Sequence, residues 1–430
     1  MKALLIVSLT FAGTILMPLA QADDAKLCSI PPSTYPLAKI DYPDYAFAIE
    51  QLENLGTATW YTDREIDGDF VGVAERLVEA CDNSTRLTAV VYGLPNKDCE
   101  AGYSSGGNVT NAAEYEAFIS SLADVVGDRK ALFILEPDAV GLLGNGVDSC
   151  AEKFGYRANL KTAIQHLSAN PNADIYVDVG FWRLADPGQA AHIAEIVRDI
   201  SNAGRVKGIT LNTSNYQGTN AMVQMCNNFQ TAYGSKDLGC IIDTSRNYNA
   251  YNGSEWCNVR SGGIGHPPTS KTGIDNIDYF VWVKPPGESD GECDGDDHTS
   301  DAMVGPEAGL FFPEEFELLW DQGYFVQEEG MATLRVDEAK KSGSNTSAGV
   351  IVVICLVVVG TVLACGFWFL RRRRAQLEKP LGTNFKAIIT PTPHRDSLRS
   401  LESVRKDLHR GSIAHCASEP PIETRRTVEE

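Results

Sequence analysis

The sequence of 430 residues predicts an α/β protein: a seven-stranded β/α (TIM-like) barrel, then one transmembrane helix and a disordered tail. Between about residues 50 and 330, short apolar runs alternate with segments that carry apolar residues at helical spacing, which is typical of a parallel sheet. About seven such units in one domain favour a closed barrel over an open sheet. Residues 348–370 carry no charge and are long enough to cross a bilayer.

The amino terminus has the pattern of a secretory signal peptide over residues 1–22. Lys2 precedes an apolar stretch that ends in Ala20-Gln21-Ala22, an A-x-A cleavage site. A short membrane anchor is the alternative interpretation. The apolar run is short for an anchor and the cleavage residues are suitable, so we expect a mature domain that begins at residue 23.

The predicted strands of the domain 23–330 each end in polar residues. They are TATWYT (57–62), LTAVVYGL (87–94), ALFIL (131–135), DIYVDVG (174–180), GITLN (208–212), CIID (240–243) and YFVWVK (279–284). The segments 114–126 and 189–203 between them have the amphipathic pattern of helices.

The carboxyl-terminal part predicts a single-pass membrane protein of type I. Residues 331–347 form a polar linker to the helix 348–370, and Arg371 to Arg374 follow at once, as expected on the cytoplasmic side. The tail 371–430 has few aromatic residues and 13 Lys/Arg against 8 Asp/Glu, so we expect a basic, disordered, cytoplasmic segment, whose partners the sequence does not identify. The domain itself is then extracellular.

Charge and cysteine content agree with an extracellular domain. The net charge of −20 argues against a nucleic-acid partner, since phosphate binding needs basic patches. Eight cysteines in the domain predict four disulfides, but eight thiols allow 105 pairings. Glycosylation sequons start at five asparagines, of which Asn212 follows an apolar run and is expected to be buried: Asn83, Asn108, Asn212, Asn252 and Asn345.

The polar residues at the strand ends predict an active-site cleft. In β/α barrels the active site lies at the carboxyl ends of the strands. A single aspartate there is often only a helix cap, and Asp138 before AVGLL is a candidate for that structural role. Convergence of five or more such groups favours chemistry. The groups are Asp98, Glu136, Asp138, Asp178, Asn212, Asp243, Arg246, Lys284, Glu288 and Asp290.

Aromatic residues beside these groups indicate a sugar-binding cleft, because sugar rings present apolar C–H faces as well as hydroxyls. They are Trp60, Trp182, Trp256 and Trp282, of which Trp282 is also a candidate core residue. No zinc, nucleotide or Ser-His signature is present, and we expect no cofactor and no metal. The acidic segment 290–301 has the spacing of a calcium loop, but it lacks the helical patterns that should flank it, which favours a solvated loop.

Several ordered motifs between residues 45 and 330 resemble glycoside hydrolase family 6, the cellulases with a distorted β/α barrel. The segments that carry the resemblance are VVYGLPNKDC, ILEPDAV, YVDVG, LNTSNY, IIDTSRN, EWCNVR and VWVKPPGESDG. The resemblance implies two disulfides, Cys99–Cys150 and Cys257–Cys293, which leaves Cys28–Cys81 and Cys226–Cys240 by elimination.

The resemblance also implies roles for individual residues. Asp138 is expected to be the general acid, with Asp98 beside it to raise its pKa, and Asp290 the base, acting directly or through a water. Inversion needs two carboxyl groups roughly 6.5–9.5 Å apart, so Glu136, two residues from Asp138, is expected only to support the site. Substrate-binding residues are expected to be Tyr92, Ser105, Trp60, Asp178, Trp182, Asn212, Trp256, Lys284 and Glu288, with Tyr92 at the distorted sugar and Ser105 on a mobile loop.

The segment DVGFWRLADP departs from the family pattern. Phe181 stands where the family has a histidine, and Trp182 is displaced from the usual tryptophan position, so the leaving-group side of the cleft is expected to differ. The acid and base candidates are retained. We therefore expect an inverting hydrolase of β-1,4-glucosidic bonds in cellulose or a related β-glucan, leaning to endo cleavage. The alternative is a catalytically weak carbohydrate-binding surface receptor.

Overall fold

The computed structural model describes residues 26–64, 69–251, 253–296 and 298–335. These residues belong to the first of the two units into which the chain divides, 1–340 and 341–430. The predicted signal peptide 1–22, transmembrane segment 348–370 and tail 371–430 lie outside the described residues, as does most of the linker 331–347. Within the described ranges, no helix has the length and apolar character needed to cross a bilayer.

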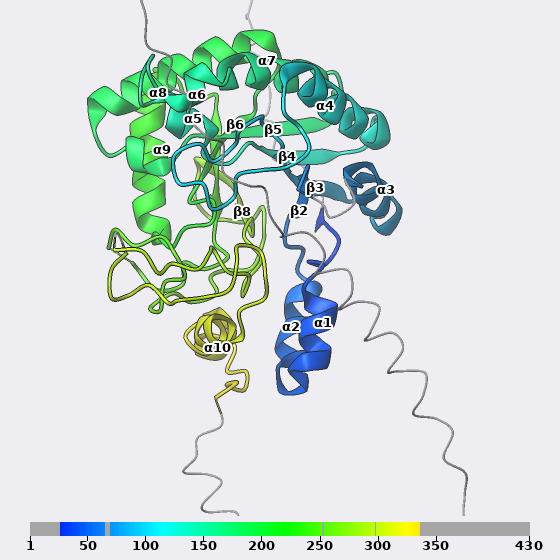
Figure 1. Ribbon diagram of the computed structural model, residues 1–430, viewed down its shortest axis with the longest axis vertical. Coiled ribbons are helices and arrows are strands. Elements are labelled where there is room, and N and C mark those ends of the chain that lie inside the picture. The colour runs from blue at the N-terminus through cyan, green and yellow to red at the C-terminus, as the bar shows by residue number, and fades with distance from the viewer. Residues whose placement is uncertain (1–25, 65–68, 252, 297, 336–430) are drawn as a thin grey trace, which may run out of the picture. The chain divides into compact units, whose positions relative to one another are not determined.

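One parallel sheet of eight strands organises the domain (Figure 1). Its order is β1-β3-β4-β5-β6-β7-β8, with β2 also paired to β3. The seven predicted strands are all found, and β1 is an additional short one. The bounds are β1 Leu27–Cys28, β2 Thr59–Thr62, β3 Arg86–Tyr92, β4 Ala131–Leu135, β5 Ala173–Asp178, β6 Gly208–Leu211, β7 Gly239–Asp243 and β8 Ile277–Val281.

The sheet curls without closing into a complete barrel. Strand pairing runs from β2 through β3 to β8, and no ladder between β8 and β2 occurs among the described strands. The two edges meet through the Ala58 N–H, which donates to the Trp282 carbonyl at 2.8 Å. The distorted barrel that the resemblance implied is found, but the expectation of a closed barrel is corrected to a partly open one, because no strand ladder joins β8 to β2 among the described strands.

Helices cover the sheet and also gather at one end of the domain. In Figure 1, α4, α7 and α8 lie along one side, whereas α1, α2 and α10 lie at the opposite end. The predicted helical segments 114–126 and 189–203 correspond to α4 and α8. The bounds are α1 Tyr35–Asp41, α2 Ala46–Glu53, α3 Phe70–Ala80, α4 Ala112–Val126, α5 Ala139–Leu143, α6 Cys150–Lys153, α7 Tyr156–Leu167, α8 Pro187–Ile200, α9 Thr219–Tyr233, α10 Pro313–Asp321 and α11 Tyr324–Gln327, with 3-10 turns at Pro43–Tyr45, Phe181–Arg183 and Ser201–Ala203.

The connection from β7 to β8 departs from strand–helix alternation. Its described residues form turns and isolated bridges and no helix. This stretch is rich in Gly, Asn, Ser and Pro, which favour turns over helices. The loop is long enough to bring Arg246 and the segment 255–258 to the carboxyl ends of the strands.

Alternation along the strands separates the inner and outer cores. On β3, Val90 and Tyr92 belong to the cluster inside the curled sheet, whereas Ala89 and Val91 belong to the cluster between sheet and helices. Four disulfides link the loops and strands, including both that the resemblance implied. They are Cys28–Cys81, Cys99–Cys150, Cys226–Cys240 and Cys257–Cys293.

Candidate active site

A cleft of about 430 Å³ opens at the carboxyl ends of the parallel strands, where a β/α architecture places its active site. Loops after almost every strand contribute to it. The lining residues are Trp60, Tyr92, Asp98, Glu100, Ala101, Tyr103, Ser104, Pro137, Asp138, Leu142, Phe181, Trp182, Thr213, Ser214, Asn215, Ser254, Trp256, Lys284 and Asp290.

Backbone strain is concentrated around this cleft. Non-glycine residues with positive φ include Asp98 (53°), Glu136 (48°), Asp138 (67°), Asn212 (68°) and Ser214 (55°). Such conformations cost free energy and persist where surrounding contacts impose them, which is common at functional sites. The strand ends are therefore shaped to aim particular side chains.

Asp138 occupies the N-cap position of α5, but its side chain caps nothing. Its carboxylate makes no capping hydrogen bond to the first turn of the helix. The backbone N–H of Asp138 instead donates to Asp178 Oδ1 at 2.9 Å. Asp178 thus fixes the backbone of Asp138, and the Asp138 carboxyl group is left to line the cleft.

The surroundings of Asp138 favour its protonated form. Burial, together with the negative charges of Asp178 and Asp98, raises the pKa of Asp138 to about 8. Burial also raises the pKa of Asp178, to about 6, although hydrogen bonds from Thr213 and from backbone N–H groups oppose this effect. The pKa of Asp138 is thus shifted in the direction that a general acid requires.

Asp98 is held by the loop that follows β3. Its Oδ2 accepts a hydrogen bond from the Ser104 N–H at 2.7 Å, and burial raises the pKa of its carboxyl group despite such bonds. The loop is anchored behind by the buried Lys97–Asp63 ion pair, 2.5 Å between Nζ and Oδ1. Ser104 lines the cleft, whereas Ser105 is exposed and its hydroxyl donates to the Gly102 carbonyl.

Glu136 supports the site from behind, as its spacing predicted. It is fully buried and accepts hydrogen bonds from the Gly93 N–H at 3.0 Å, the Leu94 N–H at 3.3 Å and the Tyr115 hydroxyl at 2.8 Å. Burial raises its pKa to about 7 in spite of these donors. These bonds join the end of β3 to the end of β4 and so fix the Asp98 loop relative to Asp138.

Asp290 lies among cations on the wall formed by the loop after β8. Its Oδ2 is 2.8 Å from Arg246 Nη1, and its Oδ1 is 3.2 Å from Lys284 Nζ. Burial acts to raise the pKa of Asp290, but the charges of Arg246 and Lys284 outweigh it, and the pKa is lowered. The cleft is therefore lined by two carboxyl groups whose pKa values are shifted in opposite directions, the pattern expected of an acid and a base.

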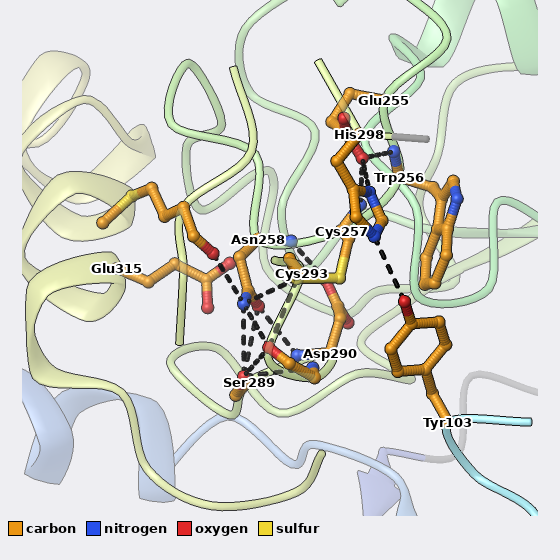
Figure 2. The surroundings of a disulfide bond; sticks show 12 residues. Tyr103, Glu255, Trp256, Cys257, Asn258, Ser289, Asp290, Cys293, His298 and Glu315 are labelled. Carbon is orange, nitrogen blue, oxygen red and sulfur yellow. Dashed lines mark hydrogen bonds and ion pairs between the residues drawn. A yellow bond between two sulfur atoms is a disulfide. The ribbon is translucent and has the colours of Figure 1, made fainter. Parts of the chain in front are cut away.

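The Cys257–Cys293 disulfide and Asn258 hold the Asp290 loop in place (Figure 2). The Asn258 side chain accepts from the Asp290 N–H at 2.8 Å and donates to the Gly291 carbonyl at 2.8 Å. The Asn258 N–H donates to Asp290 Oδ2 at 2.9 Å. The disulfide thus links two loops, both of which position the same carboxylate.

With this geometry established, comparison with known proteins identifies the family. A model of the glycosyl hydrolases family 6 matches residues 35–322, which include every strand from β2 to β8. The chain belongs to glycosyl hydrolases family 6.

Individual relatives agree with this family 6 assignment. The chain is 36% identical over 204 residues to endoglucanase A of Thermobispora bispora, covering 47% of this chain and 43% of that protein. It is 33% identical over 256 residues to endoglucanase 1 of Streptomyces sp. (strain KSM-9), covering 57% and 67%. The endoglucanase Cel6 from Mycobacterium tuberculosis has a similar structure, with a TM-score of 0.60, 25% identity, and coverage of 70% of this chain and 99% of that one.

Several aromatic side chains line the family 6 cleft. Trp60 contacts Tyr92 edge to face, with ring centroids 5.5 Å apart, and its indole N–H donates to the Val283 carbonyl. Trp182 is 41% exposed and lies in the cleft beside Phe181. Trp256 also lines the cleft, with its ring centroid 5.5 Å from that of Tyr103. Trp282, in contrast, is fully buried, which confirms the core alternative for that residue.

Besides Ser105, three predicted substrate-binding residues lie outside the set that lines the cleft: Asn212, Asp178 and Glu288. Asn212 is buried, as expected from its sequence, and its amide binds the backbone of Gln217 and Asp243. The Asp178 carboxylate accepts the hydrogen bond from the Asp138 N–H. Glu288 accepts a hydrogen bond from the Thr34 hydroxyl at 2.7 Å. All three make hydrogen bonds within the protein, which supports positioning roles, and direct contact of these residues with substrate stays a prediction.

Several residues that shape the site were missed from the sequence. Glu255 accepts hydrogen bonds from the Trp256, Cys257 and Thr299 N–H groups, and its carboxylate pairs with His298 at 3.0 Å. Tyr216 contacts Asp290 directly, and Glu315 contacts both Tyr216 and Arg246. The segments EWCNVR and LNTSNY pointed to this region, but nothing local indicates that a helix 25 residues beyond Asp290 supplies a buried carboxylate.

The described residues contain no cluster of three or more His, Cys, Asp or Glu that could hold a metal ion. In the acidic segment considered as a calcium loop, Cys293 is disulfide-bonded and His298 pairs with Glu255, while Asp297 lies outside the described residues.

Proposed function

We propose that this family 6 domain hydrolyses β-1,4-glucosidic bonds of cellulose or a related β-glucan with inversion at the anomeric carbon. The observation that carries the proposal is the pair Asp138 and Asp290. Both line one cleft, and their surroundings shift their pKa values in opposite directions. Inverting glycosidases need such an acid and base on opposite sides of the sugar, with room for a water between them.

In this mechanism Asp138 gives its proton to the glycosidic oxygen as the bond to the anomeric carbon breaks. Asp98 helps to keep the proton on Asp138 until that step. Asp290 accepts a proton from the attacking water, directly or through a second water. Tyr92 and Trp60 form an aromatic corner against which the distorted sugar ring packs. Trp182 and Trp256 also line the cleft and offer further aromatic surface to the rest of the glucan chain.

We further propose endo cleavage, a preference supported by the endoglucanases of Thermobispora bispora and Streptomyces. A cellobiohydrolase of Podospora anserina is also similar, at 31% identity over 326 residues, so the distinction depends on products. An endoglucanase lowers the viscosity of a soluble cellulose derivative early, whereas an exo enzyme releases cellobiose with little change in viscosity.

We propose a location at the cell surface, with the catalytic domain outside and the tail in the cytoplasm. The sequence patterns that support it are the predicted signal peptide 1–22, the predicted transmembrane segment 348–370 and the basic segment 371–430. Protease protection of the tail in intact cells, with the domain accessible, tests this topology. A protected domain and an accessible tail would contradict it.

The activity itself is tested on carboxymethyl cellulose, with Asp138→Asn as the inactive variant and its melting temperature as the control for folding. We expect hydrolysis by the natural protein and a loss of roughly 10²–10⁴-fold in the variant. A natural protein that binds cello-oligosaccharides without cutting them would refute the proposal and support the carbohydrate-binding receptor.

A further inference from the structure

Glu315 is a buried carboxylate next to the active site that the proposed mechanism does not use. It lies on α10, outside the strand ends that supply the cleft, and is fully buried. Its Oε1 accepts a hydrogen bond from the Tyr216 hydroxyl at 2.8 Å and lies 3.4 Å from Arg246 Nη1. Figure 2 shows Glu315 beside the loop that carries Asp290.

Glu315 and Asp290 share the same two donors. The Tyr216 hydroxyl is 3.1 Å from Asp290 Oδ2, and Arg246 Nη1 is 2.8 Å from that oxygen. A tyrosine hydroxyl has one proton, so Tyr216 can donate to only one carboxylate at a time. The guanidinium of Arg246 also lies over the Tyr216 ring, 4.1 Å from its centroid, which fixes both donors between the acids.

The charges around the pair come from four segments. Arg246 follows β7, Tyr216 follows β6, Lys284 and Asp290 follow β8, and Glu315 lies on α10. Two cations therefore face two carboxyl groups in a largely buried cluster. Burial raises the pKa of Glu315 to about 7, although Arg246 and Tyr216 oppose the shift, whereas the pKa of Asp290 is lowered. Protonation of Glu315 leaves Asp290 alone with both cations.

We propose that Glu315 is a positioning residue that sets the basicity of Asp290 by competing with it for Arg246 and Tyr216. The proposal rests on the role of Asp290 as base in the proposed function. When Glu315 is ionised, its charge and its share of the two donors weaken the hold on Asp290, which becomes the stronger base. When Glu315 is neutral, Asp290 is held more tightly and the rate of hydrolysis falls.

The test is the pH dependence of kcat for the full chain acting on a soluble cello-oligosaccharide. Glu315→Gln keeps the shape and removes the charge, so we expect its acid limb to move to lower pH by about one unit. We also expect kcat at the optimum to fall roughly tenfold, because a weaker base slows the reaction. KM should stay within about twofold of the natural value, since Glu315 does not line the cleft.

Tyr216→Phe supplies an independent variant with no change of charge. It removes the hydrogen bond that stabilises ionised Glu315, so the pKa of Glu315 rises and the acid limb should move to higher pH. The two substitutions thus shift the limb in opposite directions. Glu314→Gln is the matched control, because it makes the same change on an exposed neighbour in α10 and should leave the profile unchanged.

An acid limb that stays in place in Glu315→Gln, or that moves the same way in both variants, overturns the proposal. A purely structural role would lower the melting temperature without these opposite shifts. If Glu315→Gln does not fold, a limb that stays or moves to lower pH in Tyr216→Phe refutes the proposal. A natural protein without hydrolytic activity refutes the proposed function instead, which keeps the two failures distinguishable.

Discussion

Asp138→Asn is expected to abolish activity and at the same time to stabilise the folded protein at neutral pH. An aspartate in an unfolded chain has a pKa of about 3.9. In the folded domain burial, Asp178 and Asp98 raise the pKa of Asp138 to about 8. Between these two values the folded protein keeps a proton that the unfolded chain releases, so the free energy of unfolding falls as pH rises.

The size of the expected stabilisation follows from the shift in the pKa of Asp138. One pKa unit corresponds to about 1.4 kcal/mol, and pH 7 lies about three units above the unfolded value, so the upper limit is about 4 kcal/mol. Asp138 is partly exposed to the cleft, and solvent reduces the expectation to about 2 kcal/mol. Because asparagine does not titrate, the substituted residue adds no pH dependence to the free energy of unfolding. The gain from the substitution should therefore be absent below about pH 4 and largest above about pH 8.

Urea unfolding of both proteins at pH 4 and pH 7.5 measures this difference, with hydrolysis of carboxymethyl cellulose assayed in parallel. We expect equal free energies of unfolding at pH 4 and a more stable variant at pH 7.5. A gain of the same size at both pH values, or none at pH 7.5, would show that Asp138 does not hold its proton in the folded protein.

Further predictions concern Asp98, Trp182 and the Cys257–Cys293 disulfide. Asp98→Asn removes a negative charge beside Asp138 and should move the alkaline limb of kcat to lower pH, by less than one unit. An unchanged limb would show that the charge of Asp98 does not raise the pKa of Asp138. Trp182→Ala should raise KM roughly tenfold, since about 1–2 kcal/mol of aromatic contact is lost, and an unchanged KM would place the sugar elsewhere. Replacing Cys257 and Cys293 by serine should cost about 2–5 kcal/mol of stability and lower kcat by loosening the base. Removal of the Cys28–Cys81 disulfide at β1 is the control, and we expect it to lower stability without lowering kcat.

The strands were predictable because each is a short apolar run bounded by polar residues. For Asp138 the sequence left a helix cap and chemistry as alternatives. The structure bears on the first alternative, since the residue occupies the N-cap position but makes no capping hydrogen bond, and the chemical role stays a proposal. Local pattern could not resolve which of two adjacent serines faces the cleft. Ser104 does and Ser105 does not, because backbone direction within a loop depends on its anchors.

Other features could not be predicted because they arise from tertiary contacts. Glu315 has the ordinary pattern of an acidic residue in the first turn of a helix, and only the fold places it against Arg246. Asn212 was expected to bind substrate from its place after β6, but its amide is used entirely by the backbone around it. A polar residue at a strand end can bind substrate or hold a loop, and the sequence does not distinguish these roles.

The most direct test of the account is the stereochemistry of the first product. Proton NMR of a cello-oligosaccharide digest, recorded before mutarotation, reports the configuration at the newly formed reducing end. Acid Asp138 and base Asp290 acting on opposite sides of the sugar predict the α-anomer in the earliest spectra. A β-anomer at that stage would require a covalent intermediate on a carboxylate and would contradict the proposed division of roles.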